Sequence, residues 1–245
     1  MKNDDRTILA FDAVTTAADV LYDARIIGAT FALRAGELAL IRFDPHAPRS
    51  PLPDAAMGLA ELSGGAVQIL GQSWEALSPR ASCRLRGRIG RLFGMQDAWV
   101  DHLDIDENVT LRLRHHTRRR LSVIDREANE LSRAFGLPGL PTIRPATAEP
   151  RDLQRAACAR MLMGSPQLLI IDEPASGLYS DVLAALMREV AVARRRHVAV
   201  LWISADPIVW TDDSIAPTFR GDAGEPGLAL MDLAKTATLA GLTAG

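Results

Sequence analysis

Lysine is almost absent from this sequence of 245 residues. It occurs only at Lys2 and Lys235, so arginine supplies 26 of the 28 basic residues. Mechanisms that need a lysine ammonium, such as a phosphate-loop cation or a Schiff base, are therefore difficult to place in the middle of the chain.

Cysteine and long apolar runs are also scarce. The two cysteines, Cys83 and Cys158, cannot form a disulfide framework, and neither has a neighbour at metal-ligand spacing, which favours a reducing compartment and no metal site. No run approaches the ~20 apolar residues of a membrane helix, and residues 1–6 precede no apolar stretch. We therefore expect a cytoplasmic protein whose membrane role, if any, comes through a partner.

The charge is nearly balanced, with 28 basic and 30 acidic residues and a formal net charge of −2. This balance excludes a strongly basic nucleic-acid binder, so we expect no nucleic-acid partner. With 48% hydrophobic and 24% charged residues, the chain lies in the globular range and is long enough to bury a large core.

Strand and helix patterns alternate along the chain. Apolar patterning predicts strands at 7–14, 26–34, 37–43, 66–70, 88–93, 167–171 and 197–204, and helices at 54–61, 153–163, 180–194 and within 106–136. Residues 44–53 contain four prolines and are predicted to form a loop. The alternation predicts an α/β fold with a largely parallel sheet, and the proline-bounded region 106–150 reads as an insertion.

Two acids follow the strongly apolar strand 167–171. An Asp at such a strand end fixes Mg²⁺ in nucleotide-hydrolysing cassettes and the next Glu positions water, which would be the roles of Asp172 and Glu173. A buried strand ending in solvated acids is the alternative. The flanking segments, 154–162 (QRAACARML) and 174–178 (PASGL), favour the first interpretation.

With these segments the sequence resembles the ATP-binding cassette (ABC) ATPase family over about residues 8–220. The resemblance implies a RecA-like, mostly parallel sheet with an antiparallel β subdomain and an α-helical subdomain. It places the α/β core and antiparallel subdomain in residues 1–95 and 160–220, the helical signature subdomain in 96–159, and a C-terminal segment in 221–245.

The family's signature and phosphate loop are both degenerate here. The signature LSGGQ aligns with residues 148–152, where Glu149, Pro150 and Arg151 replace the serine and glycines that bind phosphate. The phosphate loop GxxxxGK[ST] aligns with residues 43–50 (FDPHAPRS), so both glycines are lost and Arg49 replaces the lysine, while Ser50 could still ligate Mg²⁺.

Smaller family motifs are altered in the same way. Tyr179 stands at the D-loop aspartate and Ala205 at the switch histidine, and Gln96 is out of register with the Q-loop glutamine. The sequence LSGG at 62–65 lies too early to be the signature and is predicted to be a turn before a strand.

These losses predict a non-catalytic, vestigial pocket formed by Arg49, Ser50, Asp172 and Glu173, in which neither acid is catalytically active. We expect Arg49 to reach toward one of the two acids and to replace the metal, unless the loop 44–53 turns outward and leaves both acids solvated. No cofactor is expected, with ATP and Mg²⁺ bound weakly if at all.

The resemblance also implies partners. A membrane permease would contact the surface formed by Met95, Gln96 and Trp99, although core packing is an equal alternative for Trp99. The second partner would be another cassette, as a homodimer or a heterodimer, at the inner or plasma membrane. The leading hypothesis is a pseudo-ATPase subunit of a transporter. The alternatives are an ATPase with altered site geometry and a soluble regulator without a permease.

Overall fold

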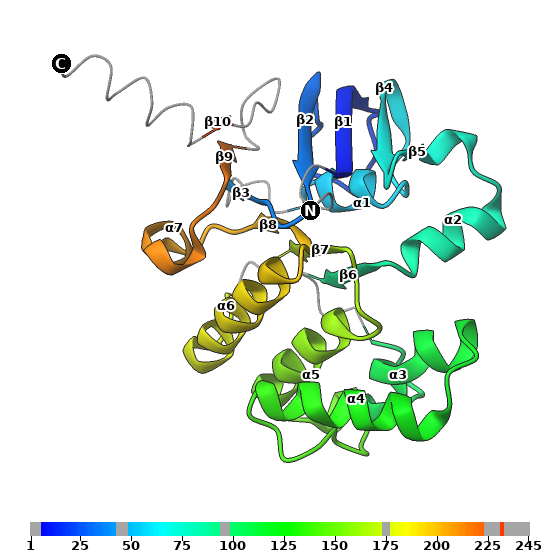
Figure 1. Ribbon diagram of the computed structural model, residues 1–245, viewed down its shortest axis with the longest axis vertical. Coiled ribbons are helices and arrows are strands. Elements are labelled where there is room, and N and C mark those ends of the chain that lie inside the picture. Colours follow the sequence, from blue (N-terminus) through cyan, green and yellow to red (C-terminus); the bar gives the residue numbers. More distant parts are fainter. Residues whose placement is uncertain (1–5, 43–48, 94–98, 173–176, 223–230, 233–245) are drawn as a thin grey trace.

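The computed structural model describes residues 6–42, 49–93, 99–172 and 177–222, together with the backbone of residues 231–232. Two sheets organise these residues (Figure 1). The larger sheet has the strand order β10-β9-β3-β8-β7-β6, and its neighbours are parallel except for the antiparallel pair β9–β10. Its strands are β3 (Leu38–Arg42), β6 (Ile89–Leu92), β7 (Leu168–Asp172), β8 (Ala199–Ile203), β9 (Phe219–Asp222) and β10 (Met231–Asp232).

The smaller sheet is antiparallel, with the order β2-β1-β4-β5. Its strands are β1 (Thr7–Thr16), β2 (Ala29–Arg34), β4 (Leu62–Ile69) and β5 (Gln72–Ser73). The segment 62–65, predicted to be a turn, forms the first half of β4, so that prediction is wrong. A Cβ on Gly65 would lie 2.4 Å from the carbonyl oxygens of Asp12 and Ala13, so close strand approach explains this glycine.

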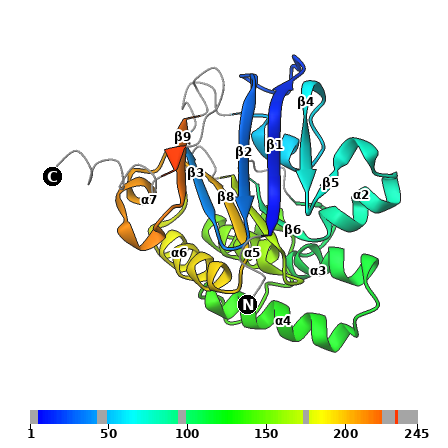
Figure 2. The same ribbon diagram turned by 45° about the horizontal axis from the view of Figure 1, so that its top comes forward.

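Helices cover the two faces of the parallel sheet differently. In both ribbon views the antiparallel sheet lies on one side of the parallel strands and α5 and α6 lie on the other (Figures 1 and 2). One core fills the space between the sheets and includes α1, and a second packs α5 and α6 against the opposite face. The helices are α1 (Leu52–Ala56), α2 (Pro79–Arg86), α3 (Ile105–His116), α4 (Leu121–Ala134), α5 (Pro150–Leu162), α6 (Ser180–Arg195) and α7 (Pro207–Thr211).

The helical group α3, α4 and α5 has a small core of its own, centred on Ile105, Val109 and Ile124. An N-terminal capping box at Asp104 and Glu107 fixes the start of α3. The fold class predicted from the sequence is thus observed: a mostly parallel sheet, an antiparallel sheet and a helical group. Within the described residues no helix is long and apolar enough to span a bilayer.

Candidate functional site

The carboxyl ends of the parallel strands meet at one edge of the larger sheet. Arg42 ends β3, Asp172 ends β7, and Ser204 follows β8. Crevices outside the carboxyl ends of such strands are the usual ligand sites of α/β sheets. This edge, hereafter the carboxyl edge, is where the candidate site lies.

An arginine from the neighbouring strand faces Asp172. The Arg91 guanidinium places Nη1 2.5 Å from Oδ1 of Asp54 and Nη2 3.6 Å from Oδ2 of Asp172. The Tyr22 hydroxyl donates to the other oxygen of Asp54 at 3.0 Å. The Arg91 side chain is 10% exposed, and those of Asp54 and Asp172 are 24% and 23% exposed. One protein cation therefore lies between two largely buried carboxylates.

Strand periodicity explains why Arg91 occupies this place. Ile89 belongs to the core between the sheets, and side chains two residues apart on a strand point to the same face. That face is covered by α1, whose Asp54 meets the guanidinium. The ring of Phe93, the residue directly after this strand, lies 4.6 Å from the guanidinium carbon and adds a cation–π contact.

Arg49 does not take the place predicted for it. Its guanidinium is forked on Asp23, with Nη2 2.7 Å from Oδ1 and Nε 3.2 Å from both carboxylate oxygens. The Arg49 backbone N–H also donates to that carboxylate at 3.0 Å, and these hydrogen bonds hold the pKa of Asp23 below its ordinary value. The ion pair predicted for Arg49 is thus made to Asp172 by Arg91. Glu173 lies outside the described residues.

Ser50 lies immediately before α1. Its hydroxyl oxygen accepts a hydrogen bond from the Leu52 backbone N–H at 3.2 Å, which places it at the first turn of that helix. Pro51 is the N-cap residue, and α1 ends at Ala56 instead of continuing to residue 61 as predicted. Gly58, with φ of +63°, follows the helix and turns the chain away.

The region aligned with the signature binds the start of α6. The Gln154 side chain donates to the carbonyl of Gly177 at 3.1 Å and accepts from the backbone N–H of Tyr179 at 2.9 Å. The Arg151 guanidinium lies 4.7 Å from the Tyr179 ring centroid. Gln154, which lies two residues after the aligned signature, therefore holds α5 against the segment that leads into α6.

Trp99 is the one residue of the predicted partner surface that the structure describes, since Met95 and Gln96 lie outside the described residues. It packs against the core of the helical group, and the guanidinium of Arg160 lies 4.4 Å from its ring centroid. Burial lowers the pKa of Arg160 to about 10. These contacts agree with the core-packing interpretation of Trp99, while the partner-binding role stays a prediction.

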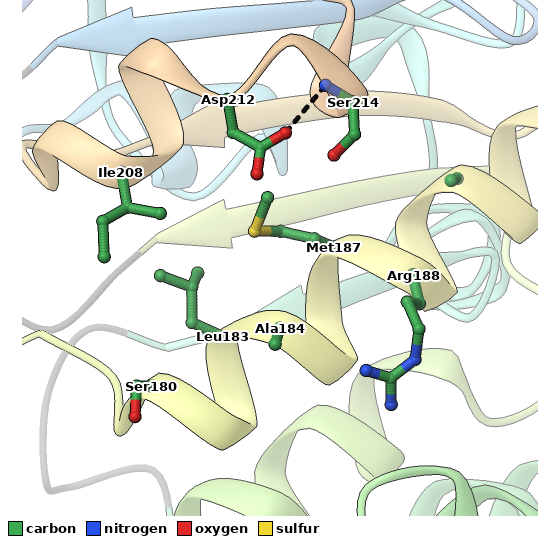
Figure 3. A pocket seen from close by; sticks show the side chains of 9 residues that line it. Ser180, Leu183, Ala184, Met187, Arg188, Ile208, Asp212 and Ser214 are labelled. Atoms are coloured by element: carbon green, nitrogen blue, oxygen red, sulfur yellow. Dashed lines mark hydrogen bonds between the residues drawn. The ribbon is translucent and has the colours of Figure 1, made fainter.

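A groove of about 410 Å³ lies elsewhere, between α6 and α7 (Figure 3). Leu183 and Met187 of α6 and Ile208 of α7 supply its apolar wall. The Asp212 carboxylate accepts from the Ser214 backbone N–H at 2.7 Å, a bond that lowers the pKa of Asp212 and caps a short 3₁₀ turn. The Asp212 carboxylate of this groove is thus used in local structure.

Sequence reasoning missed Arg91 and its partner Asp54. The available signal was a single charged residue at an inward-facing position of the strand 88–93, directly before two apolar residues. The partners lie 37 and 81 residues away in the chain, so local patterning could not identify them.

No protein-family model matches the chain. Curated relatives include the methionine import ATP-binding protein MetN 2 of Paraburkholderia xenovorans, 28% identical over 83% of this chain and 53% of that protein. Another is the molybdate/tungstate import ATP-binding protein WtpC of Archaeoglobus fulgidus, 29% identical over 74% of this chain and 73% of that protein. The match thus spans about half the length of the first of these relatives.

Solved structures show the same fold. A dimeric bacterial ABC transporter cassette superimposes with a TM-score of 0.74 at 18% identity, covering 92% of this chain and 99% of that one. For cbiO1 from Clostridium perfringens the TM-score is 0.73 at 17% identity, with 96% and 92% covered.

The comparisons contradict one expectation. The relatives are named ATP-binding proteins, and a similar cassette is known bound to ADP and Pi. The expectation that no cofactor is involved is therefore wrong. The chain thus has the fold of the ATP-binding cassettes and is similar in sequence to ATP-binding proteins of import systems.

Proposed function

We propose that this chain is a cassette subunit of a membrane transporter complex that binds ATP without hydrolysing it. Its partners are a membrane permease and a second cassette, and it lies at the cytoplasmic face of the membrane through the permease. The import roles for which its relatives are named support the transport part of this proposal.

The donor chemistry of the carboxyl edge fits ATP with Mg²⁺. Ser50 and Asp172 carry the hydroxyl and carboxylate oxygens that Mg²⁺ prefers, and they would hold the metal. A bound metal would draw charge from the phosphates. The cations that phosphate binding requires are supplied at this edge by arginine.

The observation that carries the loss of hydrolysis is the position of Arg91. Phosphoryl transfer depends on preorganised charge. Asp172, the acid that would bind the metal, already has Nη2 of Arg91 3.6 Å from its Oδ2. Two unit charges at that separation attract by about 5 kcal/mol at an effective dielectric constant of ~20. The attraction competes with a metal for the same carboxylate.

Sequence features outside this ion pair point in the same direction. The switch histidine is Ala205, and the lysine and glycines of the phosphate loop are absent. An altered ATPase would have to act through Asp172 and Glu173 without those groups. Removing Arg91 alone should therefore not restore turnover.

Phosphate release by the purified chain tests the loss of hydrolysis. We expect no turnover of ATP with Mg²⁺ above a blank without protein, and no difference between wild type and Glu173→Gln. Turnover in the wild type that disappears in Glu173→Gln would show an active ATPase and overturn the proposal.

Affinity purification from membranes tests the transporter part separately. We expect the tagged chain to retain an integral membrane protein after detergent extraction. Recovery of the chain without any integral membrane protein, under conditions that preserve a known transporter complex, would instead favour a regulator without a permease.

A further inference from the structure

A positively charged turn joins α3 to α4. Residues 114–123 are exposed without a break, and they contain four arginines and no acidic residue in a chain whose net charge is −2. In both ribbon views this turn lies at the end of the helical group that is remote from α6 (Figures 1 and 2). The segment 114–123, hereafter the cationic tip, is therefore accessible to a large partner.

Two of the four arginines have acidic partners on α4. Nη2 of Arg114 lies 3.0 Å from Oδ1 of Asp125, and Arg119 pairs with Glu127. Within the part of the chain that the structure describes, no carboxylate lies within ion-pair distance of the other two, Arg118 and Arg120. These two guanidinium groups can therefore meet an external anion without first losing a carboxylate partner.

The start of α4 does not offset this charge. Arg120 is the N-cap residue of the 14-residue helix and makes no side-chain cap hydrogen bond, and the first turn contains no acidic residue. The N-terminal end of a helix carries a partial positive charge, which disfavours cations there and favours anions. Arg118 and Arg120 thus lie where their own helix adds to the positive charge.

Aliphatic side chains accompany these arginines. Leu121 and Val123, in the first turn of α4, are 58% and 40% exposed. Side chains on a helix tilt toward its N-terminus, so both lean toward the arginines of the tip. The core of the helical group is contacted instead by Ile124 of the same turn. Cationic groups beside exposed aliphatic side chains are the combination that binds at the boundary between lipid headgroups and acyl chains.

We propose that the cationic tip binds the surface of an anionic lipid bilayer. Arg118 and Arg120 bind headgroup phosphates, which a guanidinium meets through two parallel N–H···O bonds, and Leu121 and Val123 enter the boundary below the headgroups. An acidic protein would satisfy the arginines but would leave the aliphatic pair without a role. The inference rests on the membrane location in the proposed function, and on neither ATP binding nor the loss of hydrolysis.

Co-sedimentation of the full chain with lipid vesicles tests the assignment. The chain should bind vesicles that contain about 30% phosphatidylserine more strongly than vesicles of phosphatidylcholine alone, and added salt should weaken this binding. Each arginine near an anionic surface contributes about fivefold to the partition coefficient, so Arg118→Ala with Arg120→Ala should lower it about 10- to 30-fold.

A second pair of arginines supplies the matched control. Arg195 and Arg196 are also exposed neighbours, but they lie at the C-terminal end of α6. Replacing both by Ala removes the same charge from the chain and should leave vesicle binding unchanged. Leu121→Ser with Val123→Ser should lower the partition coefficient about 3- to 10-fold and leave its salt dependence intact, because only apolar contact is lost.

Two outcomes would overturn the assignment. One is a wild-type chain that does not sediment with anionic vesicles at millimolar lipid, which would favour an acidic protein partner or a solvated surface. The other is an equal effect of the tip and control arginine pairs, which would assign the binding to overall charge. A chain that binds vesicles but recovers no integral membrane protein from membranes would refute only the proposed permease contact. Recovery of a permease without vesicle binding would refute only the lipid contact.

Discussion

Replacing Arg91 by Met tests the central ion pair of the candidate site. The substitution keeps most of the side-chain volume but leaves the carboxylates of Asp54 and Asp172 without the cation between them. Removing one partner of a fully buried ion pair costs about 3–5 kcal/mol, whereas exposed pairs contribute about 0–1 kcal/mol. Because the arginine is nine-tenths buried and both acids are about three-quarters buried, we expect a loss of about 2–3 kcal/mol.

Thermal and urea unfolding measure this loss. For a chain of this length about 1 kcal/mol corresponds to 2–4 °C, so the Tm of Arg91→Met should fall by roughly 5–10 °C. The Tm of Arg91→Lys should fall less, because an ammonium keeps the positive charge, although it lacks the forked guanidinium that reaches toward two acids. Added salt should change these differences little, because screening acts mainly on exposed charges.

A double-mutant cycle separates the ion pair from general packing. Asp54→Asn removes one of the two opposed carboxylates, so in the Arg91→Met background it should recover part of the lost stability. The expected coupling energy is about 1–2 kcal/mol. A Tm for Arg91→Met within about 2 °C of the wild type, or additive single substitutions, would refute the reasoning.

Two further predictions concern packing and titration. Gly90→Ala should lower the free energy of unfolding by more than about 2 kcal/mol, since the new Cβ would lie 2.0 Å from the carbonyl oxygen of Met161. Gly28→Ala is the comparison: its Cβ would meet no atom within 4 Å, so it should cost only about 1 kcal/mol for the left-handed backbone. Burial first, and then the nearby carboxylate of α1, raise the pKa of Tyr22 to about 12. The contribution that the protonated Tyr22 phenol makes to the free energy of unfolding should be complete below pH 10. It should be lost as the pH rises toward 12. Ultraviolet titration of Tyr179→Phe isolates this group, and a midpoint near 10 would contradict the prediction.

The apolar strands of the parallel sheet could be predicted from the sequence because burial on both faces leaves a continuous hydrophobic run. The strand predicted at 167–171 is β7, Leu168–Asp172, and the strand predicted at 197–204 is β8, Ala199–Ile203. Helix α2, Pro79–Arg86, was not predicted, although Ser78 caps it by accepting from the Ala81 backbone N–H. Only Ser82 and Leu85 of this helix are buried, so its apolar stripe is too short for periodicity to reveal.

The candidate site was harder to predict because its contacts join distant parts of the chain. Alignment to a motif placed Arg49 next to the acids by position alone, and the carboxylate of Asp23 determined where its side chain went. Conversely, Arg91 matched no motif but lies on the strand beside β7, with its side chain on the face that α1 covers. Motif alignment identifies positions in a fold. Which carboxylate each arginine pairs with depends instead on which side chains lie close together in three dimensions.

Arginine and lysine are not interchangeable at this edge, for a geometric reason. A guanidinium binds carboxylates along its edge and aromatic rings with its face. Arg49 and Arg91 use the edge on Asp23 and Asp54, and Arg42 uses the face on Trp210. A lysine at position 49 would lose the forked contact to Asp23 and would still lack a loop of converging N–H groups. Restoring the family's ammonium alone should therefore not create an ATPase, because the phosphate loop, the pairing of Asp172 and the switch position would all have to change together.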